Sequence, residues 1–115
     1  MALPSLDGRV FDMVSSTASR VDPDAPTRFD YHEAHGVVWG GYRGDTVLEG
    51  RFVAVRRGDE IDVSFVHALV AGGVVSGSAT SRIEADPDRP GALLLVEDFE
   101  VDGVLHRSVC AEVHP

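Results

Sequence analysis

The chain has 115 residues, of which 43% are hydrophobic and 25% charged, and its formal net charge is -9. This length predicts one domain over residues 1–115, and the composition is that of a globular protein rather than a disordered or membrane-spanning one. The negative charge argues against nucleic acid and anionic membranes as partners, because both attract clustered positive charge. The N-terminus carries no basic flank followed by a long apolar stretch, so we expect a cytoplasmic location.

Turn signals recur at short, regular intervals along the chain. They are pairs or short runs of Gly, Asp, Pro and similar residues, which close tight turns because Gly adopts positive φ and Asp bonds its own backbone. They lie at residues 7–8, 22–26, 35–36, 44–45, 58–59, 72–73, 86–91 and 102–103. The runs between them are roughly eight to twelve residues long, a spacing that favours a sandwich or barrel over an alternation of strands and helices.

The runs between the turns have the composition of strands, with alternating or β-branched side chains. Only residues 10–20 allow a helix, because Phe11, Val14 and Ala18 are spaced for one face, but Ser15-Ser16-Thr17 disfavours it. We interpret this run as a strand, or a strand plus a short turn. The sequence therefore predicts an all-β fold, an antiparallel up-and-down meander of about eight strands that closes into a small barrel and leaves no exposed edge.

A set of short motifs is similar to a known family. It comprises Phe29-Asp30-Tyr31, Val37-Val38-Trp39-Gly40-Gly41-Tyr42-Arg43-Gly44, Phe65-Val66-His67, Leu95-Val96-Glu97 with Phe99, and Ser108 to Glu112. Over residues 27–114 the chain resembles the small bacterial avidin-like domain proteins, many of which carry the label N-acetylglutamate synthase. The resemblance implies a calycin-like or avidin-like barrel and no defined activity. A synthase acting on acyl-CoA needs a larger cofactor site than this chain can build, so we do not expect that activity.

Aromatic side chains supply the candidate ligand-binding wall: Tyr31, Trp39, Tyr42, Phe65 and Phe99. A barrel ligand site is mostly apolar with a few polar anchors, which such residues can provide. The competing interpretation is that they only fill the core, since side chains can fill an eight-stranded barrel. The family tends to have tryptophans where this chain has Phe99 and Val101, which implies a different pocket.

Three ionisable residues are candidates for chemistry or for anchoring a ligand. Alternation places His67 on the apolar face of its strand, where it is a candidate general base, with Glu97 as a second catalytic candidate. Arg82 is a candidate for holding a ligand carboxylate. The alternatives are structural: His67 bonded to Glu97 or Glu112, and Arg82 paired with either glutamate.

No motif points to a metal or a cofactor, and none is expected. His32, Glu33 and His35 lack a spacing suited to a metal, and Cys110 has no neighbour in sequence that would activate a thiol. We expect Cys110 to be a small buried residue.

Three functions remain open on these observations. The first is a barrel that binds a small hydrophobic molecule in an aromatic-lined interior. The second is a cofactor-free cyclase or isomerase acting on a polyketide- or terpenoid-like metabolite, with a proton moved by His67 or Glu97. The third is a protein-binding or inhibitory barrel that uses loops such as residues 86–91. A homodimer is a further possibility, because barrels often pair through strand faces.

Overall fold

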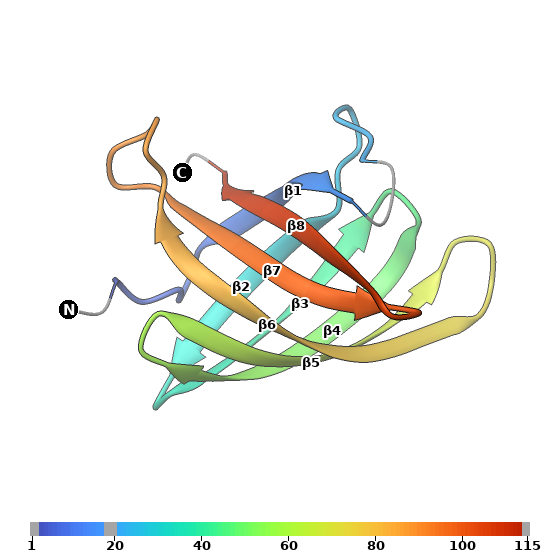
Figure 1. Ribbon diagram of the computed structural model, residues 1–115, viewed down its shortest axis with the longest axis horizontal. Coiled ribbons are helices and arrows are strands. Elements are labelled where there is room, and N and C mark those ends of the chain that lie inside the picture. Colours follow the sequence, from blue (N-terminus) through green and yellow to red (C-terminus); the bar gives the residue numbers. More distant parts are fainter. Residues whose placement is uncertain (1–2, 18–20, 114–115) are drawn as a thin grey trace.

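The computed structural model describes residues 3–17 and 21–113, and these form eight strands and no helix (Figure 1). The strands are β1 (Val10–Ser16), β2 (Arg28–Ala34), β3 (Val37–Gly44), β4 (Val47–Arg57), β5 (Glu60–Leu69), β6 (Val74–Ala85), β7 (Leu93–Val101) and β8 (Val104–Glu112). Each strand pairs antiparallel with the next, and β8 pairs with β1, so the sheet closes. The predicted all-β, up-and-down barrel is confirmed. No helix in the described ranges is long and apolar enough to cross a membrane.

The turns lie where the sequence placed them, and their backbone explains the choice of residues. His35 and Gly36 join β2 to β3 with φ angles of 54° and 78°, and Asp102 and Gly103 join β7 to β8 with 51° and 80°. Two successive positive φ angles define the type I′ turn, whose twist matches the twist of the strands it connects. Residues 10–16 form β1, so the strand interpretation of this run is correct; residues 18–20 lie outside the described residues.

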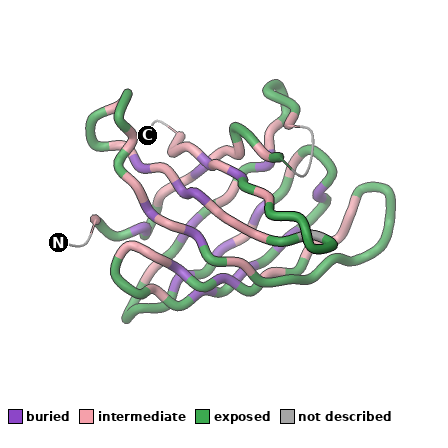
Figure 2. Tube along the Cα trace, viewed as in Figure 1, coloured by how far each residue is buried: buried purple, intermediate pink, exposed green. Residues whose placement is uncertain are grey.

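Buried residues alternate with more exposed ones along much of the sheet (Figure 2), because successive side chains of a strand point to opposite faces. In β4, Phe52 and Ala54 are buried, while Val53 and Val55 are exposed. The buried cluster draws on all eight strands and on the segment before β1, and it consists of Leu6, Phe11, Tyr31, Val38, Tyr42, Val47, Phe52, Ala54, Ile61, Val63, Ile83, Leu93, Leu95 and Cys110. Cys110 is therefore a small buried residue, as expected.

The barrel has two different ends, and the chain closes one of them. This sealed end carries the β2–β3, β4–β5 and β6–β7 hairpins and the segment before β1. Leu6 of that segment is fully buried, and its N–H donates to Glu33 Oε1 at 2.9 Å. Arg56 donates to the carbonyls of Leu3 at 2.7 Å and Pro4 at 3.0 Å. These bonds hold the segment across the barrel.

The opposite end, which carries the other hairpins, is less completely filled. Several of its inward-facing side chains stay partly accessible to solvent, among them Phe65, His67, Glu97, Phe99 and His106. Solvent therefore reaches the interior from this side, which we call the open end.

Candidate functional site

A hydrogen-bonded tyrosine and histidine lie inside the open end. The register pairs Gly50 of β4 with Tyr42 of β3 on one side and with His67 of β5 on the other. Tyr42 Oη lies 2.7 Å from His67 Nδ1, and the two ring centroids are 5.5 Å apart. A Cβ at residue 50 would lie 2.5 Å from the Tyr42 ring, so glycine is what lets the phenol cross β4 and reach the imidazole.

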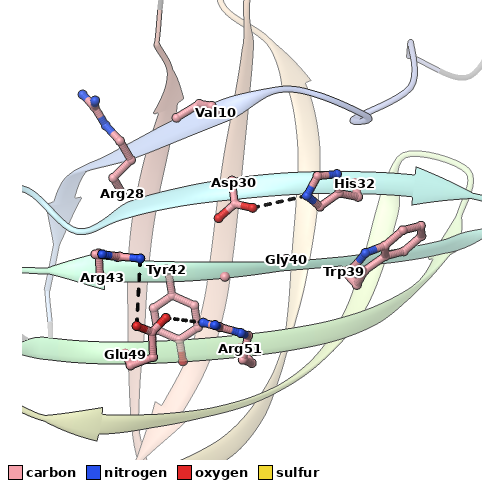
Figure 3. Close-up of a pocket in the computed structure, with 11 residues that line it drawn as sticks. Val10, Arg28, Asp30, His32, Trp39, Gly40, Tyr42, Arg43, Glu49 and Arg51 are labelled. Carbon is pink, nitrogen blue, oxygen red and sulfur yellow. Dashed lines mark hydrogen bonds and ion pairs between the residues drawn. The ribbon is translucent and has the colours of Figure 1, made fainter.

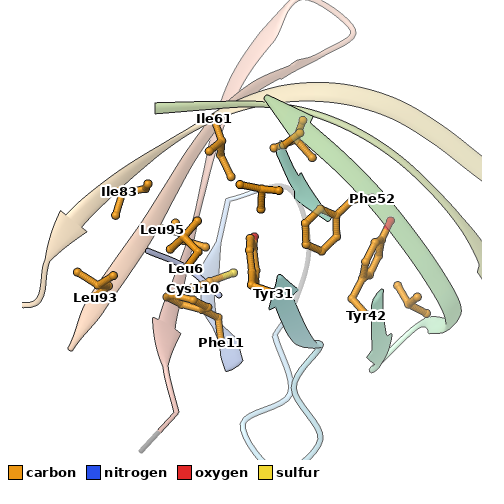
Figure 4. Packing of buried hydrophobic residues seen from close by; sticks show 14 residues of the cluster. Leu6, Phe11, Tyr31, Tyr42, Phe52, Ile61, Ile83, Leu93, Leu95 and Cys110 are labelled. Atoms are coloured by element: carbon orange, nitrogen blue, oxygen red, sulfur yellow. The ribbon is translucent and has the colours of Figure 1, made fainter. Parts of the chain in front are cut away.

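Aromatic rings continue from this pair into the core (Figure 4). The Tyr31 ring lies 5.2 Å from that of Phe11 and 4.7 Å from that of Phe52, and Tyr42 stacks on Phe29 at 4.9 Å. Tyr31 is only 7% exposed, yet its hydroxyl forms no hydrogen bond with any residue of the described ranges. A buried phenol normally has a partner, so this hydroxyl retains its full capacity to bond a ligand.

Glu97 of β7 contributes a carboxyl group with neutral partners. The register places it opposite Ser81 of β6 and Ser108 of β8, both buried. The Ser81 hydroxyl donates to Glu97 Oε1 at 3.2 Å, and Ser108 also bonds the carboxyl group. No ion pair within the described part of the chain involves Glu97, because each described arginine pairs with another carboxylate.

Burial sets the protonation of these groups. It raises the pKa of Glu97 and lowers the pKa of His67. Burial, with the charge of Glu97 as a smaller cause, also raises the pKa of Tyr31 and of Tyr42. At neutral pH His67 is therefore neutral and Tyr42 protonated, and we assign Tyr42 as the donor to Nδ1. Nε2 of His67 then carries the ring hydrogen and is left to donate to a ligand.

The thiol of Cys110 lies in the same interior but is not a nucleophile. Burial, followed by the charges of Glu97 and Asp12, raises the pKa of Cys110 to about 12. Because the thiolate is the reactive form, this thiol is inert at neutral pH. In the described part of the chain, no three or more His, Cys, Asp or Glu side chains form a group that could hold a metal ion.

The interior brings together most of the residues that the sequence singled out: Tyr31, Tyr42, Phe65, His67, Glu97 and Phe99. Phe65 stacks with His67 at 6.0 Å, and Phe99 stacks with His106 at 5.6 Å. A Cβ at Gly77 would lie 2.8 Å from the Phe65 ring, so this glycine makes room for an aromatic side chain as Gly50 does for Tyr42.

Two of the predicted site residues lie on the outer face of the barrel instead. Trp39 is 40% exposed and stacks on His32 with centroids 5.7 Å apart. Arg82 donates to Asp98 at 2.7 Å and pairs with Glu84. Each follows from alternation, because the neighbours of Trp39 and Arg82 along their strands face inward.

Both predicted structural pairings are wrong. His67 bonds Tyr42 and neither glutamate, and Arg82 bonds Asp98 and Glu84. Arg9 Nη1 donates to both carboxylate oxygens of Glu112, at 2.8 and 2.9 Å, near the sealed end. The register of the closed sheet, rather than the composition of any one strand, decides these partners.

A groove of about 590 Å³ crosses the outer face of β2, β3 and β4 (Figure 3). This outer groove is lined by Val10, Arg28, Asp30, His32, Trp39, Gly40, Gly41, Tyr42, Arg43, Glu49 and Arg51. Several of its polar side chains already have partners: Arg28 pairs with Asp12, Arg51 bonds Glu49, and the His32 ring lies 3.3 Å from Asp30.

Sequence reasoning missed Ser81, Ser108, Phe52 and Gly50. The alternation of a strand could have identified Ser81. Ser81 lies two positions before the buried Ile83, and every second residue of a strand points to the same face. The role of Gly50 can be recognised only from the pairing of β4 with β3 and β5, which the local sequence does not reveal.

Comparison with known proteins agrees with this architecture. The family model described as "Avidin-like protein" matches residues 4–113. The chain belongs to this family of avidin-like proteins, as the sequence motifs indicated. Neither the search of curated proteins nor the search of solved structures found a match.

Proposed function

We propose that this protein binds a small molecule with an apolar body inside the open end of the barrel. One observation carries the proposal: polar groups with unused hydrogen-bonding capacity lie there among aromatic rings. They are the Tyr31 hydroxyl, Nε2 of His67 and the Glu97 carboxyl group. Ligand sites in proteins combine such an apolar wall with a few aimed polar groups.

The interior is a better candidate than the outer groove because of how the charges are distributed. In the groove, Arg28 and Arg51 are each hydrogen-bonded to a carboxylate, so a ligand would have to break an existing contact. In the interior, the Tyr31 hydroxyl and Nε2 of His67 gain a hydrogen bond without losing one.

Binding is tested with an uncharged aromatic dye, N-phenyl-1-naphthylamine, whose fluorescence rises in apolar surroundings. We expect saturable binding at one site, weakened several-fold by His67→Ala and by Phe65→Ala. Trp39→Ala is the control, because Trp39 faces outward and its loss leaves the interior intact. No saturable binding would refute the proposal. Binding that Trp39→Ala abolishes and His67→Ala spares would move the site to the outer face and favour a surface function such as protein binding.

A second candidate, proton transfer in a cyclase or isomerase, is favoured by one observation. Glu97 has a raised pKa and His67 a lowered one, so burial favours the uncharged form of each group, an acid in one case and a base in the other. Tyr42 bonds His67 directly and is influenced by the charge of Glu97, so the groups share one site. The test is turnover at saturating ligand: loss in both Glu97→Gln and His67→Ala under conditions where each variant is fully occupied supports catalysis.

A further inference from the structure

Glu97 differs from every other described acid in its surroundings. The described carboxylates that are not exposed to solvent otherwise have a cationic partner, as Glu33 has Arg56 and Glu112 has Arg9. Glu97 has two serine hydroxyls instead, although the chain has ten arginines and no lysine. A carboxylate removed from water without a cation is unfavourable. The described part of the fold supplies no cation to Glu97, so a ligand could supply one.

The surroundings of Glu97 also suit a cation. Glu97 shares the barrel interior with the phenols of Tyr31 and Tyr42, and its charge is one of the smaller influences on both. Phe52, in contact with both tyrosines, and Phe65, stacked with His67, extend the aromatic wall. Aromatic faces attract cations through their quadrupole, more strongly where water is excluded.

The free hydroxyl of Tyr31 adds an acceptor to the same interior. Because no described residue bonds Tyr31 Oη, its lone pairs are available to an N–H donor. An ammonium group has three such donors, and the Glu97 carboxylate and the Tyr31 oxygen can accept two of them. A ligand anion would instead meet the charge of Glu97 within a chain of net charge -9.

From this arrangement we infer that the ligand of the open end is a small organic ammonium ion, held by Glu97 and by Tyr31, with its apolar body against Tyr42 and Phe65. The inference rests on the proposed function and adds the chemical class of the ligand. The acidic surface of the protein favours the approach of such a cation.

The test uses three probes with the same phenylalkyl body and different heads: 2-phenylethylamine, 2-phenylethanol and 3-phenylpropionate. Affinities are measured by titration calorimetry at neutral pH on the whole chain. Since a hydrogen bond to a charged group contributes about 1.5–3 kcal/mol, we expect the amine to bind at least about tenfold more tightly than the alcohol. The carboxylate is expected to bind most weakly.

Two variants assign the preference to a residue. Glu97→Gln keeps the shape and removes the charge, so it should abolish the preference for the amine and still bind the alcohol. Asp98→Asn is the matched control: it removes the same charge from the next residue, which faces outward and pairs with Arg82 and Arg107, and it should keep the preference. Thermal unfolding followed by circular dichroism checks that each variant is folded.

The outcomes separate the two proposals. If the amine and the alcohol bind wild type equally, or if Glu97→Gln keeps the preference, the inference is overturned while interior binding stands. If none of the three probes binds wild type and the dye does not bind either, both the inference and the proposed function fail.

Discussion

Tyr42 and His67 lie on strands that are not neighbours, yet Tyr42 Oη and His67 Nδ1 are 2.7 Å apart. The strand between them contributes Gly50 at the crossing point, so the bond spans β4 without meeting a side chain. A bond of this kind ties β3, β4 and β5 together on the inside of the barrel, in addition to the backbone ladder on either side of β4.

The first prediction concerns the strength of this bond. Tyr42→Phe removes the hydroxyl and should lower the free energy of unfolding by about 1 kcal/mol, the usual net contribution of a hydrogen bond. The measurement is urea unfolding of Tyr42→Phe, His67→Ala and the double variant. We expect a coupling energy of similar size between the two residues; strictly additive effects would show that the bond contributes nothing.

The second prediction compares two glycines. Gly50→Ala places a methyl group 2.5 Å from the buried Tyr42 ring, and Gly77→Ala places one 2.8 Å from the Phe65 ring. Forcing extra volume into a packed interior costs about 1–3 kcal/mol. Because Phe65 is only partly buried, it can move aside, so Gly77→Ala should be the milder change. Thermal denaturation checks the order, and equal loss in both variants would contradict it.

The third prediction concerns the sealed end. The Arg56 side chain is 9% exposed and bonds Glu33 and the carbonyls of the N-terminal segment. Arg56→Met leaves a buried carboxylate without its cation and should lower the free energy of unfolding by about 3 kcal/mol. Arg57→Met is the control: Arg57 is 56% exposed, pairs with Asp62 on the surface, and should leave the urea midpoint almost unchanged.

Solvent exchange provides a second readout for Arg56→Met. Amide hydrogens of residues 6–9 should lose protection, because the segment that carries them is held by Arg56 and Glu33. Full protection in this variant would show that the other contacts of the segment, such as those of Leu3 with Asp59 and of Arg9 with Glu112, anchor it without Arg56.

The fourth prediction is a pH dependence with a defined sign. The pKa of Glu97 in the folded protein lies above its usual 4.5, chiefly through burial. As pH rises past 4.5 the unfolded chain ionises first, so this group destabilises the fold increasingly until the pH has passed the folded pKa, above which the penalty stays constant. Glu97→Gln lacks that effect, so its stability relative to wild type should increase as the pH rises past 4.5 and should level off once the pH has passed the folded pKa of Glu97.

Asp98→Asn should behave in the opposite way. Bonds from Arg107 and Arg82 lower the pKa of Asp98 below its usual 3.8. Asp98 therefore stabilises the fold above pH 3.8, and this contribution is lost as the pH falls through the folded pKa. Urea unfolding of both variants over a pH series that extends below 3.8 checks the two slopes, and parallel slopes would contradict the assignment.

The sequence predicted the strands and the inward orientation of His67, because both depend on local rules. Turn residues end each strand, and alternation with Ile61 and Val63 places His67 inside. The same rule, applied to β3, separates Trp39 from Tyr42: they are three positions apart and must face opposite sides. Grouping both in one ligand wall was inconsistent with that rule.

The partners within the site depend on contacts between strands, which no single segment encodes. Tyr42 meets His67 only because β3 and β5 are both in register with Gly50, and Glu97 meets Ser81 and Ser108 through two further ladders. A shift of one residue in any ladder would turn a strand's side chains to the other face. The registers are properties of the closed barrel, so pairing residues by chemical type alone assigned the wrong partners to His67 and Arg82.

Trp39 is the one tryptophan of the chain, and it lies outside the barrel, stacked on His32. Its intrinsic emission therefore reports on the outer wall of β2 and β3 and not on the interior. A ligand that enters the open end should therefore leave that emission nearly unchanged. Tryptophan fluorescence would miss binding in this protein, and a tyrosine or ligand signal is required to detect it.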